Sequence, residues 1–148
     1  MSGDEFAGQT AVVVGGVACL DRNFDGDQES VDALGPDAIA LEMDVTDDRA
    51  VVAAIGEAER RLGPIAVLVN CAGITGVTDR RSQDVDIEDF DLVCRINLRG
   101  AFLLSRAVLP RMVSQGYGRV LHVASIAGKE GNAGMGPTPR PRPGSSAW

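Results

Sequence analysis

The segment Ile65-Ala66-Val67-Leu68-Val69-Asn70-Cys71-Ala72-Gly73 decides the architecture that the sequence predicts. Its first five residues are all apolar, which is typical of a strand buried on both faces of a sheet. The small residues that follow end in Gly73 and form a turn where the backbone can approach a ligand closely. An ordinary strand-to-loop turn without a ligand is the alternative interpretation.

Strand and helix patterns alternate along the rest of the chain. Strands are expected at Thr10–Val14, Val17–Leu20, Ala38–Met43 and Arg119–Val123, with a loop at Asn23–Ser30. Helices are expected at Glu29–Leu34, from a Thr46 cap to Leu62, and from an Asp86 cap to Ser114. This alternation predicts an α/β fold with a parallel sheet and helices on both of its faces.

Composition limits the classes of function. A chain of 148 residues holds one domain at most, and its net charge of −7 argues against a nucleic-acid surface. No apolar run approaches membrane-spanning length, and the start lacks a signal-peptide pattern. Cys19, Cys71 and Cys94 show no metal-type spacing, so buried free thiols in a reducing cytoplasm are expected.

Four segments between Gly8 and Met135 together resemble the short-chain dehydrogenase/reductase family. Val67–Gly73 is similar to the family's Asn-Asn-Ala-Gly signature, with Cys71 in place of the second Asn. The other three matching segments are Glu42–Thr46, Ile96–Gly100 and Val120–Gly128. The resemblance implies a Rossmann-like, doubly wound parallel sheet and hydride transfer between NAD(P) and a small alcohol or ketone. Gly128–Asn132 is similar to sugar-acid and oxoacyl-carrier reductases of the family, which does not select a substrate.

The resemblance also assigns roles to single residues. Ser125 would orient the substrate oxygen, and Asn97 would hold a water in a proton relay. The cofactor-binding residues would be Gly15, Asp21, Asp44, Val45, Asn70, Ala72 and Gly73, and Asp21 would favour NAD over NADP. Taken singly, Asn97 can be an exposed polar residue and Ser125 a structural one. Asp44 can simply lie exposed beside a capping Thr46, and His122 is interpreted as a core or sheet residue.

The amino end departs from the family. A Rossmann-type site needs a glycine-rich turn and then a crossover helix, with the acidic residue about 20 residues beyond the turn. Here only Val17 to Leu20 separate Gly16 from Asp21, so the first crossover helix is missing. A strand, two glycines and another strand indicate an antiparallel hairpin, or one unpaired segment. In either arrangement the pyrophosphate loses its helix N-terminus.

The carboxyl end departs as well. Written in GC-rich codons and read in the neighbouring frame, Pro137–Trp148 becomes Tyr-Ser-Ala-Ser-Lys-Ala-Gly-Val-Ile-Gly-Leu, which contains the family's Tyr-x-x-x-Lys motif. The shifted tyrosine would follow Ser125 by about a dozen residues, as it does in the family. The frame present here has neither catalytic residue, because Tyr117 and Lys129 do not match those positions. The later strands are also missing.

These observations predict an incomplete NAD(P)-binding domain over 1–135 and a disordered, frameshifted tail over 136–148. The leading functional hypothesis is an impaired dehydrogenase that binds NAD weakly. A second hypothesis is a non-catalytic interaction protein that forms homo-oligomers through the helix at 86–114. A third takes the Pro-Arg tail as a polyproline segment that binds a groove of a partner.

Overall fold

The computed structural model describes residues 10–14 and 16–125. The strands are β1 (Thr10–Val14), β2 (Gly16–Asp21), β3 (Ala38–Glu42), β4 (Val67–Asn70) and β5 (Arg119–His122). The helices are α1 (Phe24–Leu34), α2 (Asp48–Leu62), the short 3-10 turn η1 (Ser82–Asp84), α3 (Ile87–Val93), the π-helix η2 (Cys94–Gly100) and α4 (Ala101–Gln115). The α/β prediction is confirmed, whereas the predicted tail at 136–148 lies outside the described residues.

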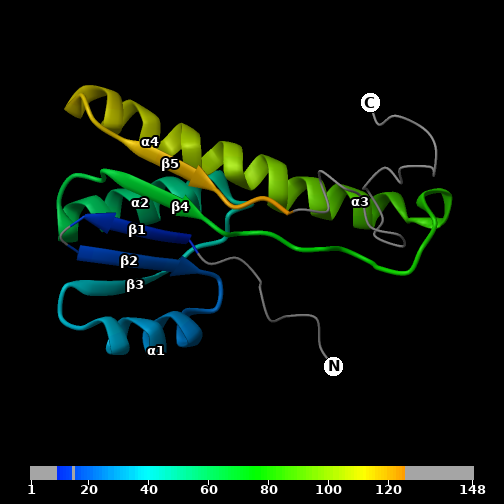
Figure 1. Ribbon diagram of the computed structural model, residues 1–148, viewed down its shortest axis with the longest axis horizontal. Helices are drawn as coiled ribbons and strands as arrows, with labels where there is room; N and C mark the ends of the chain where they lie inside the picture. The colour runs from blue at the N-terminus through cyan, green and yellow to red at the C-terminus, as the bar shows by residue number, and fades with distance from the viewer. Residues whose placement is uncertain (1–9, 15, 126–148) are drawn as a thin grey trace.

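The five strands form one sheet in the order β3-β2-β1-β4-β5 (Figure 1). β1 runs antiparallel to both of its neighbours, while β2 pairs parallel with β3 and β4 pairs parallel with β5. The predicted hairpin is therefore confirmed, and within the partly parallel sheet β1 is the one described strand that runs against the others. The physical reason is length, because parallel neighbours need a crossover of about ten residues or more and a single residue joins β1 to β2.

The hydrophobic core lies between the sheet and the pair α2 and α4, which pack against each other (Figure 1). Its buried members are Ala18, Leu20, Met43, Val45, Val51, Ala54, Ile55, Ala58, Ile65, Leu68, Ala72, Leu103, Leu104, Ala107, Val108 and Met112. Two charged contacts at its rim, Arg106 with Asp48 and Arg111 with Glu59, also join α4 to α2. The helices α2 and α4 thus lie on the core face of the sheet.

The other face is covered only in part. α1 packs there against β2 and β3, at one edge of the sheet. Leu68 of β4 points into the core, so by strand alternation Val69 and its β5 partner Leu121 point to the opposite face. Leu121 is 55% exposed, so no described helix covers this part of the sheet. Helices on both faces are therefore present only over β2 and β3.

Three local predictions are corrected. Residues 24–30 belong to α1 and not to a loop, because Asp25 and Asp27 suit the first turn of a helix and Val31 anchors it. The cap of α2 is Asp47, whose carboxylate accepts the backbone N–H groups of Arg49 and Ala50. Asp86 precedes α3 but makes no side-chain capping hydrogen bond.

The predicted long helix is present as the continuous run of α3, η2 and α4, which ends at Gly116 with φ +70. A π-helix in its middle was not expected from the sequence. At Gly100, the last residue of η2, an added Cβ would lie 3.0 Å from Cγ2 of Val45. A glycine there lets the helix approach the end of the β3 segment closely.

The close approach at Gly16 provides a test of the hairpin. A Cβ at Gly16 would lie 2.7 Å from the backbone oxygen of Asp37 and 2.8 Å from Cδ2 of Leu62. We expect Gly16→Ala to lower the free energy of unfolding by about 1–3 kcal/mol in urea denaturation followed by circular dichroism. The control is Gly56→Ala within α2, where a Cβ meets nothing within 4 Å. That variant should gain about 0.5–1 kcal/mol, and equal stability of the two variants would contradict the packing.

Candidate functional site

A pocket lies where β2, β3 and β4 end. Because β1 is antiparallel to both β2 and β4, those two strands run the same way and their carboxyl ends share one edge of the sheet. The residues that line the pocket are Asp21, Arg22, Met43, Asp44, Val45, Ala72, Gly73, Ile74 and Ile96. The pocket thus combines an acidic group, a guanidinium and an apolar floor.

Asp21 ends β2 at the rim of this pocket and is buried. Its Oδ1 accepts the backbone N–H of Asn23 at 2.8 Å, which fixes the carboxylate in place. Burial raises the pKa of Asp21, although the backbone hydrogen bonds at Asn23 and Arg22 and the Arg22 charge act in the opposite direction. A fixed carboxylate of this kind can accept hydrogen bonds from two neighbouring hydroxyls.

A second carboxylate, Asp27 in α1, lies buried close to Asp21. Burial, reinforced by the Asp21 charge, raises the pKa of Asp27 to about 6, and a backbone hydrogen bond at Asp21 opposes this. Its Oδ2 is buried without a hydrogen-bond partner among the described residues. Sequence reasoning missed Asp27 because it placed residues 23–30 in a loop. The spacing of Asp27 and Val31, four residues apart, was the signal that could have shown a shared helix face.

The β3 side of the pocket is shaped by Asp44 and Val45. The Asp44 carboxylate accepts both the backbone N–H and the hydroxyl of Thr46, each at 2.8 Å, so Thr46 does not cap α2. Val45 is buried and belongs to the core, while Asp44 is exposed. The turn therefore presents one carboxylate and one apolar side chain to the pocket.

The β4 side carries the turn after Asn70. Ala72 and Gly73 line the pocket, but Asn70 itself is buried behind it. The Asn70 Oδ1 accepts the Ala72 N–H at 3.0 Å, and its amide group contacts His122 at 3.1 Å. Asn70 thus shapes the turn, whereas Ala72 and Gly73 form the pocket wall.

Asn97, in η2, holds the continuation of this loop. Its Oδ1 accepts the N–H of Ile74, and its Nδ2 donates to the carbonyl of Ile74, both at 2.9 Å. The side chain therefore binds the backbone of one residue twice and fixes the loop to the helix. Its assigned role in a proton relay stays a prediction.

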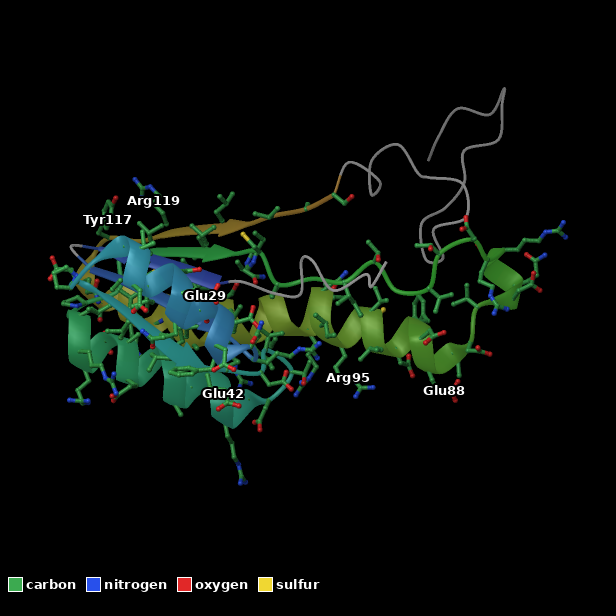
Figure 2. All side chains as sticks on the ribbon, turned by 90° about the horizontal axis from the view of Figure 1, so that it is seen from below. Glu29, Glu42, Glu88, Arg95, Tyr117 and Arg119 are labelled. Carbon is green, nitrogen blue, oxygen red and sulfur yellow. The ribbon has the colours of Figure 1, made fainter. Side chains whose placement is uncertain are left out.

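Ser125 lies just beyond the carboxyl end of β5 and is exposed. Tyr117 precedes β5, and its ring stacks under Arg119 with 4.8 Å between the guanidinium carbon and the ring centroid (Figure 2). The strand separates Tyr117 from Ser125 by roughly 25 Å of extended chain. Tyr117 therefore cannot act on a substrate at Ser125.

Of the predicted cofactor residues, the pocket brings together Asp21, Asp44, Val45, Ala72 and Gly73. Gly15 lies outside the described residues, and its neighbours Val14 and Gly16 are at the opposite end of β2 from Asp21, roughly 17 Å away along the strand. The expectation of buried thiols is wrong for Cys71, which is exposed, whereas Cys19 and Cys94 are half-buried.

A family model described as short chain dehydrogenase matches residues 4–137. The chain belongs to the short-chain dehydrogenase family. It is similar to the 2-dehydro-3-deoxy-L-rhamnonate dehydrogenase (NAD(+)) of Sphingomonas sp., with 35% identity over 86% of this chain and 57% of the relative. The predicted family and its oxidoreductase class are thus confirmed.

Solved structures of similar proteins share the fold. A xylitol dehydrogenase with bound NAD+ superposes with a TM-score of 0.76 at 35% identity, covering 80% of this chain and 46% of that chain. The 3-ketoacyl-(acyl-carrier-protein) reductase of Brucella melitensis, in complex with NADH, gives 0.74 at 28% identity, covering 80% and 50%. This short-chain dehydrogenase chain therefore spans about half the length of the relatives that it matches. The two solved structures contain NAD+ and NADH, respectively.

Two further features concern residues 10–14 and 16–125. Within them, no helix combines the length and apolar character needed to cross a bilayer. The same residues hold no cluster of three or more His, Cys, Asp or Glu side chains able to bind a metal ion.

The buried Asp27 predicts an unusual dependence of stability on pH. Its pKa of about 6 in the folded chain exceeds the ordinary value of about 4 expected on unfolding. Between these values the folded chain holds the proton more tightly, so folding stability should fall as the pH rises from about 4 to about 6 and stay low above it. We expect Asp27→Asn to raise the free energy of unfolding by about 2 kcal/mol at pH 7.5 and to leave it unchanged near pH 4.

Urea denaturation at a series of pH values measures this effect. The control is Asp25→Asn, an exposed carboxylate in the same helical turn, which should show no such pH dependence. A constant difference between the Asp27→Asn variant and the unaltered chain from pH 4 to pH 8 would rule out the shifted pKa.

Proposed function

We propose that this chain retains the adenosine half of an NAD site from a dehydrogenase that acts on a small alcohol or ketone. The observation that carries the proposal is the pocket at one sheet edge, which collects Asp21, Asp44, Val45, Ala72 and Gly73. The Asp21 carboxylate, which lines this pocket and is fixed by the Asn23 N–H, would accept hydrogen bonds from a ribose diol. A carboxylate there repels a 2′-phosphate, so NAD is favoured over NADP.

The same proposal holds that the chain turns over little or no substrate. The residues present do not fit the cofactor's pyrophosphate, because Val14 and Gly16 lie at the sheet edge away from Asp21. No helix follows β1 to point its N-terminus at a phosphate, since β2 follows directly. Hydride transfer in the family also needs a tyrosine near Ser125, and the chain's single tyrosine is Tyr117. The roles assigned to these two residues, Ser125 in orienting the substrate oxygen and Asn97 in holding a relay water, would then apply only to a relative with the complete site.

The division into a domain at 1–135 and a frameshifted tail at 136–148 is part of this proposal. It is supported by the family match, which ends at residue 137. At that point GC-rich codons read in the neighbouring frame would begin to encode Tyr-x-x-x-Lys. A cytoplasmic location is proposed as well, because the three cysteines are free and a reducing compartment keeps thiols so.

A non-catalytic role in association is the second candidate. It is favoured by four exposed apolar side chains that recur at helical spacing along η2 and α4, namely Leu98, Phe102, Leu109 and Val113. An apolar stripe on an exposed helix is a common contact surface between protein chains. Homo-oligomers through the helix at 86–114 would bury this stripe.

The test of the proposed function is a fluorescence titration of the purified chain with NADH and NADPH, together with an assay of NAD reduction by alcohols. We expect saturable but weak NADH binding and no measurable turnover. Asp21→Asn should weaken NADH binding about tenfold, through the lost carboxylate acceptor, and should affect NADPH less. Glu29→Gln, which removes an exposed carboxylate from α1, is the charge-matched control. Rapid alcohol oxidation would refute the proposal. An Asp21→Asn variant that binds NADH as tightly as the unaltered chain would also refute it.

A further inference from the structure

A chain of hydrogen bonds crosses the core side of the sheet from α4 to the pocket. The Ala72 N–H donates to the Asn70 Oδ1 at 3.0 Å, and the Asn70 Nδ2 lies 3.1 Å from the His122 Nδ1. The other ring nitrogen, Nε2, lies 2.9 Å from the Ser105 Oγ, which in turn donates to the Ala101 carbonyl at 2.9 Å. His122 is therefore the link between α4 and the turn that forms the pocket wall.

For each of these four hydrogen bonds, the donor and the acceptor can be assigned. The Asn70 oxygen faces the Ala72 N–H, so the amide nitrogen faces His122 and must donate. The His122 Nδ1 then accepts and carries no proton. In a neutral ring the proton therefore sits on Nε2 and is donated to the Ser105 oxygen, which keeps its own proton for the Ala101 carbonyl. One tautomer satisfies all four bonds.

Asn70 holds two structural segments at once. Besides the Ala72 turn, its backbone carbonyl accepts the Val123 N–H at 2.9 Å, so the end of β5 is fixed to the end of β4. The Asn70 side chain is buried, and in the described residues its amide nitrogen has His122 as its hydrogen-bond partner. Without an acceptor at 122, the Asn70 amide would be buried unpaired, and its hold on Ala72 would loosen.

We propose that His122 is a positioning residue for nucleotide binding, which acts through Asn70 to fix the Ala72–Gly73 wall of the pocket. The inference rests on the proposed function for its ligand, but the hydrogen-bond chain can be tested without one. His122 touches neither the pocket nor a reacting atom, because it is absent from the pocket lining. Its effect on binding is therefore indirect.

The first experiment is NMR of the full-length, ¹⁵N-labelled chain. His122 is its only histidine, so imidazole signals are assigned without ambiguity. The expected result for the neutral ring, recognised by the chemical shifts of its two nitrogens, is a proton on Nε2 and none on Nδ1. A neutral ring with its proton on Nδ1 in the folded chain would overturn the proposal.

The second experiment compares variants by NADH titration and by hydrogen exchange of the Ala72 amide. His122→Phe keeps an aromatic ring without an acceptor and should weaken NADH binding about tenfold while speeding Ala72 exchange by a similar factor. His122→Gln keeps one acceptor and one donor and should recover most of both losses. Leu121→Thr, at the neighbouring exposed position, is the control and should change neither. If the ring only filled space, glutamine would not restore NADH affinity and Ala72 exchange better than phenylalanine does.

The outcomes separate the two proposals. Unchanged Ala72 exchange and NADH affinity in His122→Phe would overturn the positioning role. If the unaltered chain fails to bind NADH, the proposed function fails, while the ring tautomer and the Ala72 exchange still decide whether His122 holds the turn. Should His122→Phe not fold, Ser105→Ala provides the milder variant, since it removes the acceptor of Nε2 and leaves the Asn70–His122 contact in place. It should accelerate Ala72 exchange to a smaller extent, and no change there would count against the proposal.

Discussion

The short connection between β1 and β2 constrains the whole structure. A single residue separates the strands, which is too few to return the chain to the same sheet edge, so the second strand must run back along the first. β1 also pairs antiparallel with β4 on its other side. Two reversals in succession cancel, and β2, β3, β4 and β5 keep one common direction. The carboxyl ends of these four strands therefore still meet at one edge, which is the condition for a shared pocket.

The same reversal separates features that a dinucleotide site requires together. The acidic residue Asp21 ends β2 at the pocket, whereas the beginning of β2, at Gly16, packs near Asp37 and Leu62 at the opposite sheet edge. Under the proposed function, the segments that would contact adenine and ribose follow strands that share one direction. The glycine turn follows β1, the one described strand that runs the other way. The strand arrangement would therefore disrupt the phosphate end of the proposed site and leave its adenosine end in place.

The sequence predicted features that depend on the succession of elements along the chain and on the length of their connections. It missed features that depend on neighbours distant in sequence. The hairpin followed from the missing crossover, and five pocket residues followed from the ends of the apolar strands. Asp27 was missed because a buried, unpartnered carboxylate contradicts the usual preference of aspartate for loops. The link from His122 to Ser105 spans two elements, and no local pattern encodes it. Leu121 is exposed because none of the described helices covers this part of the sheet, which the local sequence pattern of β5 does not show.

The pocket forms beside the antiparallel strand β1 because local hydrogen bonds fix the segments that line it. Three of its segments are fixed by hydrogen bonds between residues two apart, where a side chain accepts a nearby backbone N–H. These contacts are Asp21 with Asn23, Asp44 with Thr46, and Asn70 with Ala72. Such turns form from local geometry and need no particular direction of β1. Longer contacts then join the turns to the η2–α4 helix. Asn97 binds Ile74 directly, and His122 links Asn70 to Ser105 of α4. A site assembled from local turns and one helix can tolerate the reversal of a neighbouring strand, whereas a phosphate site that needs the strand and its following helix together cannot.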